Sequence, residues 1–505
     1  MNTSRLGFLL LAFSLAIAAL LTATLFICAY VEAWHTPYFE QRFATTIGLA
    51  HGQLIYQIEP IAPLFCSIYG PLSYIVYLPA ALFPTVQTVF AAGSLESTAF
   101  LVLPLVLLGY SFVRKHHLPF RDSAPVLLFA LTAIASLRPL SYVAANVSAD
   151  APSMSLMGIS ALVLFSSRDK PRWKTAAISS LALVLSVGCK QNMLLPALVM
   201  GLAVVLYFPR RFWWFYLGFS IVFSVLVLGL VTVVYHDLGA IYFNNVLIPS
   251  RYPVITANLF PGAYRLFENY AVLALTLTGI GLIGFLTQRS MAWSGRSYLA
   301  WTFFAFSIVL AIPSVRIYAA SGGDINDFAH TTYFFLLGVV AAALEIRVLT
   351  GSDPQAVLAL RTVTVIATIT LLGSGLPTRY DSEWKKQMLR QPAAFEAYDY
   401  TKRNPGHVYF PNNTIGVYMA ERKFYHAEWG IMIPAVAGTP PSVAAIFKFI
   451  PEKAQYIAIP RDSIPDEKGA ITPSVAPHFR TAAVPGLTGF HLYAIERPAE
   501  SANAN

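Results

Sequence analysis

Charged side chains interrupt a sequence that otherwise consists of long apolar segments. Glu40, in TPYFEQRF, follows the first apolar segment and is flanked by aromatic residues. A carboxylate held there could accept the proton of a hydroxyl or amine while that group attacks another centre. Glu40 is therefore a candidate general base. The alternative is a solvated carboxylate, or one that forms an ion pair with Arg42 or His35.

Two further charged residues stand at the edges of apolar segments. Asp150, in NVSADAPSM, directly precedes such a segment and either caps a helix or belongs to a site. Lys190, in GCKQNMLLP, lies between two of them. A lone lysine at membrane depth needs an anionic partner such as a lipid phosphate, or it extends to the headgroups. Both residues are candidates, and both alternatives stay open.

The stretch SGGDINDFAH contains two carboxylates and an imidazole, Asp324, Asp327 and His330. The glycines before them permit a close approach of the backbone. This spacing could bind a cation, but it matches no specific metal-binding pattern, and a structural hairpin is the alternative. We therefore predict no metal site, although a divalent cation is not excluded.

Two arginines are further candidates for contacts with phosphate. Arg316 lies shortly before the SGGDINDFAH stretch. Arg265 belongs to a second long connection, residues 235–269, which is rich in aromatic and amide side chains. That mixture suits sugar and phosphate contacts, and it suits ordinary anchoring at a membrane interface equally well.

The composition indicates that these residues are positioned by membrane helices. Of the 505 residues, 56% are hydrophobic and 12% are charged, whereas soluble domains contain roughly 25% charged residues. The net charge of +9 comes from short basic clusters between apolar segments, which is typical of membrane topology and not of a nucleic-acid interface. We predict an integral protein of the inner, cytoplasmic membrane.

The apolar segments predict eleven spans. Arg5 precedes the first, and the apolar run Leu6–Val31 is longer than a signal-peptide core of roughly 7 to 15 residues, so we expect it to be retained; a cleaved signal is the alternative. The predicted spans are Leu6–Tyr30, Val89–Val113, Ala124–Ser141, Pro152–Phe165, Ala176–Cys189, Asn192–Phe208, Phe212–Tyr235, Ala271–Thr287, Tyr298–Ile317, Thr331–Leu344 and Val357–Leu376.

Residues 31–88 form the predicted first outer loop of a membrane domain at 1–376. Its segment Gly70–Pro84 is too short to cross a bilayer and suits an interfacial or re-entrant helix. The connections then obey the positive-inside rule, which predicts a cytoplasmic N-terminus. The predicted inner basic residues are Arg5, Arg114, Lys115, Arg121, Arg168, Lys170, Arg172, Lys174, Arg210, Arg211, Arg289, Arg296, Arg347 and Arg361, and the outer ones before the tail are Arg42, Arg138, Lys190, Arg251, Arg265 and Arg316.

From Pro377 the sequence becomes more polar, which predicts a small extracytoplasmic α/β domain at 377–505. Trp384–Tyr400 has an amphipathic pattern, and short β-like runs follow it among Pro and Gly residues. The expected strands are Gly406–Phe410, Ile415–Met419, Tyr456–Ile459 and Phe490–Ile495. The three cysteines, Cys28, Cys66 and Cys189, form no metal-like spacing, and we expect buried thiols, with a Cys28–Cys66 bridge as the alternative.

Several motifs are missing from the sequence. It contains no GxxxxGK[ST], no usable GxGxxG, no HExxH, no GxSxG and no CxxC. This argues against a P-loop transporter and against a soluble type of nucleotide-sugar enzyme.

A series of short motifs, taken in order, resembles the GT-C superfamily of membrane glycosyltransferases. The match is closest to the bacterial branch of the protein mannosyltransferases and the aminoarabinose transferase, similar to glycosyltransferase family 39. Many relatives have Asp or Asp-Glu where this chain has Glu40 followed by Gln41. The motifs are Phe39-Glu40, Gly52-Gln53-Leu54-Ile55-Tyr56, Tyr69-Gly70-Pro71-Leu72, Asp150, Lys190-Gln191, Gly323-Asp324-Ile325-Asn326, and the tail segments AAFEAYDYTKRNPGHVYFPN and KAQYIAIP.

The resemblance implies an inverting transferase that takes its sugar from a polyprenyl-monophosphate donor and needs no cofactor. Glu40 would be the base, and Asp150 would position the acceptor or the base. The cations that neutralise the leaving phosphate would be Lys190, Arg265 or Arg316. Substrate contacts would come from Tyr56, Tyr69, Asp324 and Asn326. The acceptor would be a lipid, a glycan or a protein, met on the outer side among membrane lipids.

Three other functions compete with this interpretation. A transporter or flippase of lipid-linked sugars would show internal repeats and interrupted helices, and the sequence contains no repeat. A polymerase or ligase of surface polysaccharide would use a diphosphate-linked glycan. A cell-wall scaffold would have no catalytic need for Glu40.

Overall fold

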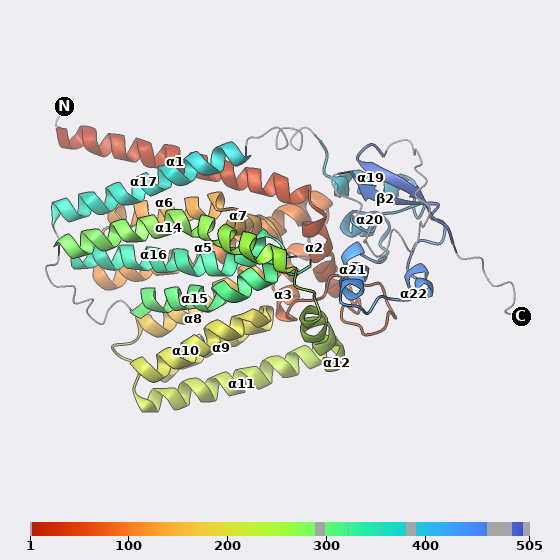
Figure 1. Cartoon of the computed structure of the whole chain (residues 1–505), viewed down its shortest axis with the longest axis horizontal. Coiled ribbons are helices and arrows are strands. Elements are labelled where there is room, and N and C mark those ends of the chain that lie inside the picture. Colours follow the sequence, from red (N-terminus) through yellow and green to blue (C-terminus); the bar gives the residue numbers. More distant parts are fainter. Residues whose placement is uncertain are drawn as a thin grey trace, which may run out of the picture.

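The computed structural model of the chain describes residues 3–287, 298–321, 323–351, 353–379, 390–461 and 487–497. Long helices lie side by side along the longest axis of the molecule, and the C-terminal part covers one end of this bundle (Figure 1). Arg289, Arg296 and residues 384–389 of the predicted amphipathic helix lie outside the described residues.

The helices of the bundle and their connections alternate along the chain. The long helices are α1 (Thr3–Trp34), α5 (Val86–His116), α6 (Phe120–Ser136), α8 (Asp150–Ser166), α9 (Trp173–Cys189), α10 (Leu194–Tyr207), α11 (Arg210–Tyr235), α14 (Leu259–Thr287), α15 (Tyr298–Tyr318), α16 (Ala329–Leu349) and α17 (Pro354–Arg379). The shorter ones are α2 (Pro37–Ala50), α3 (Leu72–Ile75), α4 (Leu78–Ala81), α7 (Arg138–Ala145), η1 (Gln191–Met193), α12 (Leu238–Tyr242), η2 (Phe243–Leu247), α13 (Ile248–Ser250), η3 (Thr256–Asn258) and η4 (Ile325–Phe328).

Each predicted span overlaps one of the long helices, and Ala124–Ser141 and Asn192–Phe208 also include part of a neighbouring short one. Within the described residues, seven helices are long and apolar enough to cross a membrane, an eighth candidate is a bent pair, and three more apolar helices are shorter. These findings give an integral membrane protein with a mostly helical fold. That all eleven segments cross the membrane stays a prediction.

The predicted span Ala124–Ser141 is interrupted, because the chain bends by 82° between α6 and α7. Leu137 has an extended conformation at this break, and Pro139 lies in the first turn of α7. Proline at a helix start lacks only an N–H group that would be unpaired in any case, so a new helix direction can begin there. The break places α7 against η4.

The predicted first loop is largely structured. It opens with helix α2, which begins where Thr36 is extended and Pro37 occupies the first helical turn. No helix is predicted from the sequence at these positions. The segment Gly70–Pro84 contains only the short helices α3 and α4 and is not among the candidate spans, as predicted.

The C-terminal part contains a three-stranded sheet with helices around it. Its elements are α19 (Ala393–Arg403), β1 (Val408–Tyr409), α20 (Thr414–Glu421), α21 (Glu428–Val436), α22 (Val443–Phe447), β2 (Tyr456–Pro460) and β3 (Phe490–Ala494). β2 is central, parallel to β1 and antiparallel to β3. Three predicted strands are present, but Ile415–Met419 is wrong, because it lies in helix α20, whose residues 414–419 are all buried.

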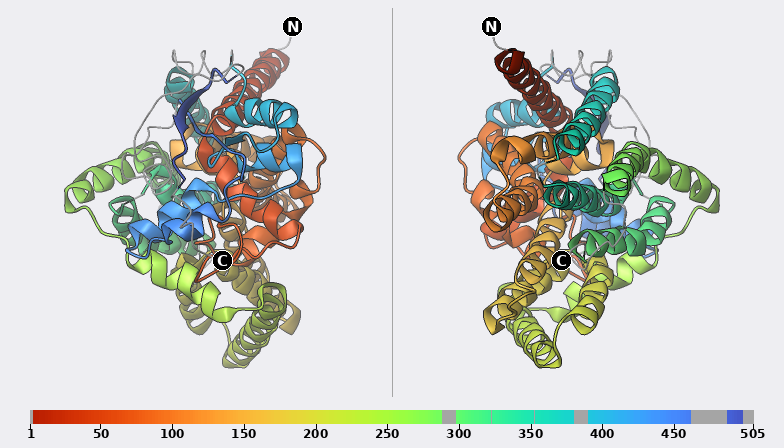
Figure 2. Two further views of the ribbon diagram at one scale, coloured as in Figure 1. Left: turned by 90° about the vertical axis from the view of Figure 1, so that its right-hand side faces the viewer. Right: turned by 90° about the vertical axis from the view of Figure 1, so that its left-hand side faces the viewer.

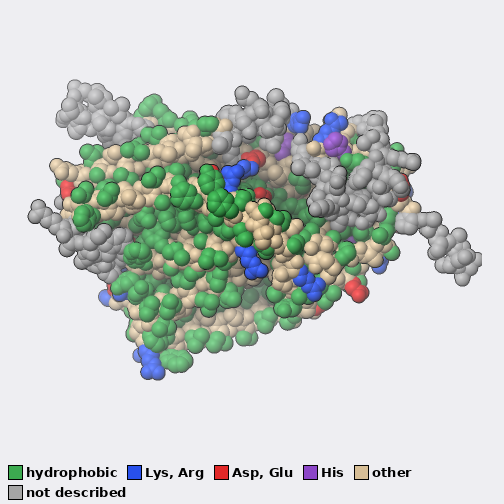
Figure 3. Space-filling view, viewed as in Figure 1, with side chains coloured by type: hydrophobic (Ala, Val, Ile, Leu, Met, Phe, Trp, Pro, Cys, Tyr) green, Lys and Arg blue, Asp and Glu red, His purple; other side chains and the backbone are tan. Residues whose placement is uncertain are grey.

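Apolar side chains cover much of the face of the bundle that Figure 3 shows. Leu275 and Ile312, for example, are 73% and 80% exposed. Exposed apolar surface over this length of helix is favourable in lipid and not in water. All three cysteines are buried and form no disulfide, as predicted.

Candidate active site

A cluster of buried charged residues lies at the end of the bundle that faces the C-terminal part. At its centre is Asp150, the first residue of α8, whose side chain is not accessible. The Lys190 Nζ is 2.5 Å from Asp150 Oδ1, and the His330 Nε2 is 3.2 Å from the same oxygen. The Arg42 Nη1 is 4.0 Å from Oδ2. Four segments far apart in the sequence therefore meet at one carboxylate.

The cap role considered for Asp150 does not match the structure of α8. Ala149, not Asp150, is the residue that caps α8, and it has no side-chain capping bond. The Asp150 carboxylate instead faces the Lys190 ammonium and the Arg42 guanidinium, which come from two other elements. A buried ion pair is stable only when its contact is close enough to offset the lost hydration of both charges, and the contact between Lys190 and Asp150 is that close.

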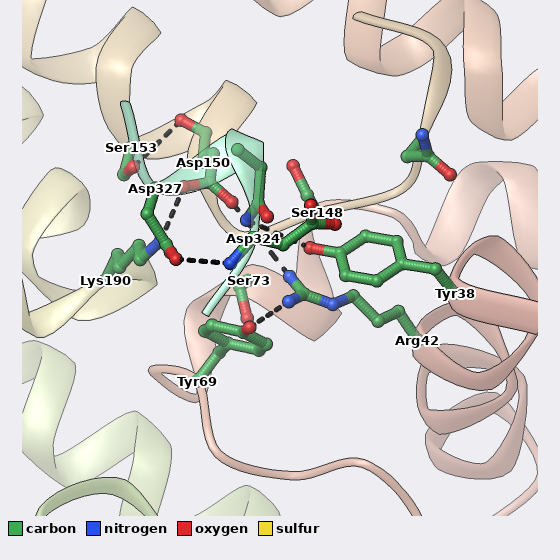
Figure 4. Close-up of polar contacts among 12 residues, drawn as sticks. Tyr38, Arg42, Tyr69, Ser73, Ser148, Asp150, Ser153, Lys190, Asp324 and Asp327 are labelled. Atoms are coloured by element: carbon green, nitrogen blue, oxygen red, sulfur yellow. Dashed lines mark hydrogen bonds and ion pairs between the residues drawn. The ribbon is translucent and has the colours of Figure 1, made fainter. Parts of the chain in front are cut away.

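Arg42 is held between two aromatic rings. Its Cζ lies 3.9 Å from the ring centroid of Tyr38 and 4.1 Å from that of Tyr69, and its Nη2 donates a hydrogen bond to the Tyr69 hydroxyl. Tyr38 and Arg42 are four residues apart on α2 and share one face of it. Figure 4 shows the guanidinium between the tyrosines and directed toward Asp150.

Two glycines permit the elements around the cluster to approach one another. A Cβ on Gly70 would overlap the carbonyl oxygens of Gly188 and Cys189, which directly precede Lys190. A Cβ on Gly323 would overlap the backbone at the end of α15. Any larger residue would therefore push Tyr69 away from Lys190, or the following η4 turn away from the bundle.

The cluster contains buried polar atoms that lack a hydrogen bond. They include Arg42 Nε and Nη1, Asp150 Oδ2, His330 Nε2 and Ser148 Oγ. Such atoms cost about 1–3 kcal/mol each when nothing pairs with them. Most of them are donors on basic groups, so a ligand that presents anionic oxygens would complete the site.

The carboxylates of η4 form the edge of the cluster. Asp327 lies beside Lys190 and Asp150, and Asp324 lies beside Ser148 and Arg42 (Figure 4). Asp327 Oδ2 accepts a hydrogen bond of 2.9 Å from the backbone N–H of Asp324, which closes the turn. Unlike Asp150, Asp327 is partly accessible and Asp324 is exposed.

Glu40 lies on a different face of α2 and contacts the C-terminal part. Its Oε1 accepts hydrogen bonds of 2.9 and 3.1 Å from the backbone N–H groups of Ile415 and Gly416, and its Oε2 accepts one of 2.8 Å from Asn413. Residues two apart on a helix point in nearly opposite directions, so Glu40 is directed away while Arg42 is directed into the cluster. The ion pair of Glu40 with Arg42, considered as an alternative, is absent from the described contacts.

The surroundings of Glu40 affect its charge. Burial raises the pKa of Glu40 from 4.5 to about 8, and the three donated hydrogen bonds oppose this rise only in part. The carboxylate stands at the N-terminus of α20, where it joins α2 to the C-terminal part. Its neighbour Gln41 strengthens the same contact by binding Asn412 and the backbone N–H of Trp429.

The other predicted site residues are dispersed. Tyr69 belongs to the cluster, and Asn326 reaches it by donating a hydrogen bond of 3.2 Å to the Tyr38 hydroxyl. Tyr56 is buried and donates to the backbone oxygen of Tyr69, which supports the loop. Arg265 pairs with Glu268 on the surface of α14, and Arg316 is exposed at the end of α15. Among the described contacts, neither arginine reaches the cluster.

Sequence reasoning assigned no site role to Arg42, Tyr38, Asp327 or His330. Arg42 and Tyr38 flank Glu40 in TPYFEQRF, and their spacing of four residues would have placed them on one helical face. This spacing indicates a shared face only if residues 37–50 are predicted to form a helix. Asp327 and His330 were noted only as a possible cation site.

Comparison of the whole chain with solved structures finds ArnT from Cupriavidus metallidurans. Its structure bound to undecaprenyl phosphate matches with a TM-score of 0.54 and 12% identity, over 96% of this chain and 97% of ArnT. Its apo structure matches with a TM-score of 0.55 and 12% identity, over 95% and 98%. No family model and no curated sequence matches the chain. The likeness shows that this chain has the GT-C fold, as the sequence resemblance predicted.

Proposed function

We propose that this GT-C chain is a glycosyltransferase that moves a sugar from a polyprenyl-monophosphate carrier to an acceptor. The observation that carries the proposal is the Arg42–Lys190 pair, buried beside Asp150, with arginine donors that no described residue uses. The likeness in fold to ArnT, one structure of which is bound to undecaprenyl phosphate, supports a lipid phosphate as the anion.

The leaving group would be bound by Lys190 and Arg42. When the acceptor attacks the anomeric carbon, the bond from that carbon to the phosphate oxygen breaks, and its electron pair stays on the phosphate. Lys190 and Arg42 then stabilise the added negative charge. Charge that is placed before the reaction and shielded from water lowers the barrier most effectively. The tyrosines that enclose Arg42 keep its guanidinium in position.

Asp150 would be the fixed counter-charge of this site. Its Oδ1 is occupied by Lys190, and its side chain has no accessible surface. A carboxylate paired in this way is a weak base. It holds both cations in place while the site is empty, and it keeps them directed at the same point.

We assign the general base to Asp327, in place of Glu40. Asp327 is at the accessible edge of the cluster, and one hydrogen bond from Asp324 fixes its orientation. Glu40 is engaged by three donors of the C-terminal part. In the proposed step the acceptor hydroxyl or amine transfers its proton to Asp327 as its bond to the sugar forms. Attack opposite the phosphate would invert the anomeric centre.

The test is sugar transfer by purified protein in detergent from a panel of polyprenyl-monophosphate sugars to lipid, glycan and peptide acceptors. We expect Asp327→Asn to reduce turnover on the order of 100-fold or more, as for loss of a general base. Arg42→Gln and Lys190→Gln are expected to reduce it on the order of 100-fold or more, as for loss of a group that stabilises developing charge. Glu268→Gln, which alters an exposed pair on α14, is the matched control and should retain turnover.

Two outcomes would contradict the proposal in different ways. Turnover that survives in Asp327→Asn but disappears in a folded Glu40→Gln variant would return the base to Glu40. No turnover with any donor, together with movement of a lipid-linked sugar across vesicles that contain the protein, would show a transporter.

A further inference from the structure

A second basic site lies at the opposite end of the bundle from the candidate active site. A partly open cavity of about 490 Å³ separates the first turn of α9 from the first turn of α11. Figure 1 shows both helices beginning at the end that the C-terminal part does not cover. The cavity is lined by Pro171, Arg172, Trp173, Lys174, Pro209, Arg211, Phe212 and Phe215.

The basic side chains of this cavity have no acidic partner. Among the described residues, no side-chain hydrogen bond or ion pair is formed by Arg172, Lys174 or Arg211, and the carboxylate of the same connection, Asp169, pairs with Lys115 at 3.2 Å. Three positive charges gathered at one cavity repel one another. An anion bound between them would remove that repulsion.

The walls of the cavity are aromatic. Lys174 Nζ lies 5.7 Å from the ring centroid of Trp173, and Arg211 Cζ lies 5.8 Å from that of Phe215. These contacts keep both cations at the rim, because an aromatic ring attracts a cation over its face. Tryptophan is also a residue that membrane proteins place at the level of the lipid headgroups.

The surface next to the cavity is apolar along the length of α11. Trp214, Ile221 and Val225 are 64%, 56% and 63% exposed. Only 6% of the residues in the most apolar stretch of α11 are buried. Figure 3 shows this run of apolar side chains leading to Lys and Arg side chains at the same end of the molecule. A ligand that combines an anionic head with acyl chains fits both surfaces at once.

We propose that this cavity binds the phosphate headgroup of an anionic membrane lipid, whose acyl chains lie along α11. Arg172, Lys174 and Arg211 bind the phosphate oxygens, and Trp173 and Phe215 cover the glycerol region. Inorganic phosphate presents the same charged oxygens, but it would not use the apolar surface of α11. The site is separate from the Arg42–Lys190 cluster and does not depend on the transferase proposal.

The test is native mass spectrometry of the detergent-solubilised protein with phosphatidylglycerol or phosphatidylcholine. We expect selective retention of phosphatidylglycerol, and a variant with Arg172→Gln, Lys174→Gln and Arg211→Gln should bind it about fivefold more weakly for each charge removed. The charge-matched control carries Arg114→Gln, Lys170→Gln and Arg210→Gln, three exposed basic residues at the same end of the bundle that do not line the cavity. It should retain the lipid.

Three outcomes would overturn the inference. The first is equal retention of phosphatidylglycerol by the cavity variant and the control. The second is equal retention of phosphatidylcholine and phosphatidylglycerol by the wild type. The third is displacement of the lipid by millimolar inorganic phosphate, which would show a site for free phosphate. Because a charge reversal could unfold the chain, neutral Gln replacements are used, and each variant must match the wild type in thermal unfolding.

Discussion

Asp150 and Asp327 lie in the same cluster, but their carboxylates have different surroundings. Asp150 is fully buried between Lys190, Arg42 and His330. Asp327 is partly accessible and bonded to the backbone of its own turn. Replacing Asp150 should therefore mainly reduce stability, whereas replacing Asp327 should mainly reduce activity.

We predict that Asp150→Asn destabilises the protein by about 3–5 kcal/mol, because it leaves two buried cations without a counter-charge. Asp327→Asn should cost less, about 1 kcal/mol, because the amide oxygen of Asn can still accept the hydrogen bond from the Asp324 N–H, while the substitution removes turnover. Chemical or thermal unfolding of both variants in the same detergent measures the difference. Equal losses of stability would mean that the two carboxylates have the same structural role.

Glu40 provides a second prediction at this scale. Glu40→Ala should cost about 2–4 kcal/mol, because it leaves the N–H groups of Ile415 and Gly416 buried without an acceptor. Glu40→Gln keeps an acceptor for them, and its amide N–H can pair with Asn413 Oδ1, which has no partner in the present arrangement. We therefore expect Glu40→Gln to stay folded and active. Loss of turnover without loss of stability would contradict this role.

The raised pKa of Glu40 also predicts the direction in which the stability changes with pH. Because its pKa is about 8 in the folded protein and 4.5 ordinarily, its contribution to stability is complete below pH 4.5 and is lost as the pH rises through 8. Glu40→Gln carries no such charge. The unfolding temperature of the wild type should fall relative to that of Glu40→Gln between pH 5 and 9, and a constant difference would contradict the assigned pKa.

At the scale of elements, α2 joins the candidate active site to the C-terminal part. One face carries Tyr38 and Arg42 into the cluster, and another carries Glu40 and Gln41 to residues 412–429. A shift of the C-terminal part would therefore move Arg42. The apolar helices around it could be predicted from the sequence, because apolar length is a local property. The partner of Glu40 could not, because Asn413 is 373 residues away along the chain.

His426, in the C-terminal part, forms a hydrogen bond with the first loop. Its Nδ1 accepts a hydrogen bond of 2.9 Å from the backbone N–H of Leu64, and its Nε2 is 3.2 Å from the backbone oxygen of Ala445. Burial lowers the pKa of His426 from 6.5 to about 4. Protonation would remove the acceptor that Leu64 needs, so the neutral ring is the form that holds this contact.

We therefore predict that this contact weakens in acid. The folded pKa lies below the ordinary one, so the contribution of His426 is complete above pH 6.5 and is lost as the pH falls through 4. Hydrogen exchange at the Leu64 amide should accelerate between pH 6.5 and 4 beyond the intrinsic change for a free amide. In His426→Phe it should be fast at both pH values. Unchanged protection at pH 4 in the wild type would contradict the prediction.

At the scale of the whole molecule, two basic groups mark opposite ends of the bundle. One is the Arg42–Lys190 cluster next to the C-terminal part, and the other is the cavity around Arg172 and Arg211 (Figure 2 shows the two ends). The positive-inside rule predicts that the cavity faces the cytoplasm. The sequence could suggest these sides because loop charges alternate along it. It could not show that Arg265 and Arg316 stay apart from Lys190, because packing of the helices decides that.

The predicted orientation can be tested with single added cysteines. The native cysteines are fully buried and should not react with a membrane-impermeant maleimide. In intact cells we expect labelling of Ser442→Cys in the C-terminal part. Lys170→Cys, in the connection at the other end, should be labelled only after lysis. The reverse pattern would invert the topology, and labelling of the parent protein would show that its buried thiols are reachable.

The central claim is that Arg42 and Lys190 bind the phosphate of a polyprenyl carrier. The most direct measurement is equilibrium binding of undecaprenyl phosphate to the wild type, Arg42→Gln, Lys190→Gln, Arg265→Gln and Arg316→Gln, each first shown to unfold in one cooperative transition above the assay temperature. We predict that Arg42→Gln and Lys190→Gln each weaken binding on the order of tenfold or more, because each removes one charge-assisted contact. Arg265→Gln and Arg316→Gln should bind the lipid as the wild type does. Unchanged binding in Arg42→Gln and Lys190→Gln, or a loss confined to Arg265→Gln and Arg316→Gln, would contradict the claim.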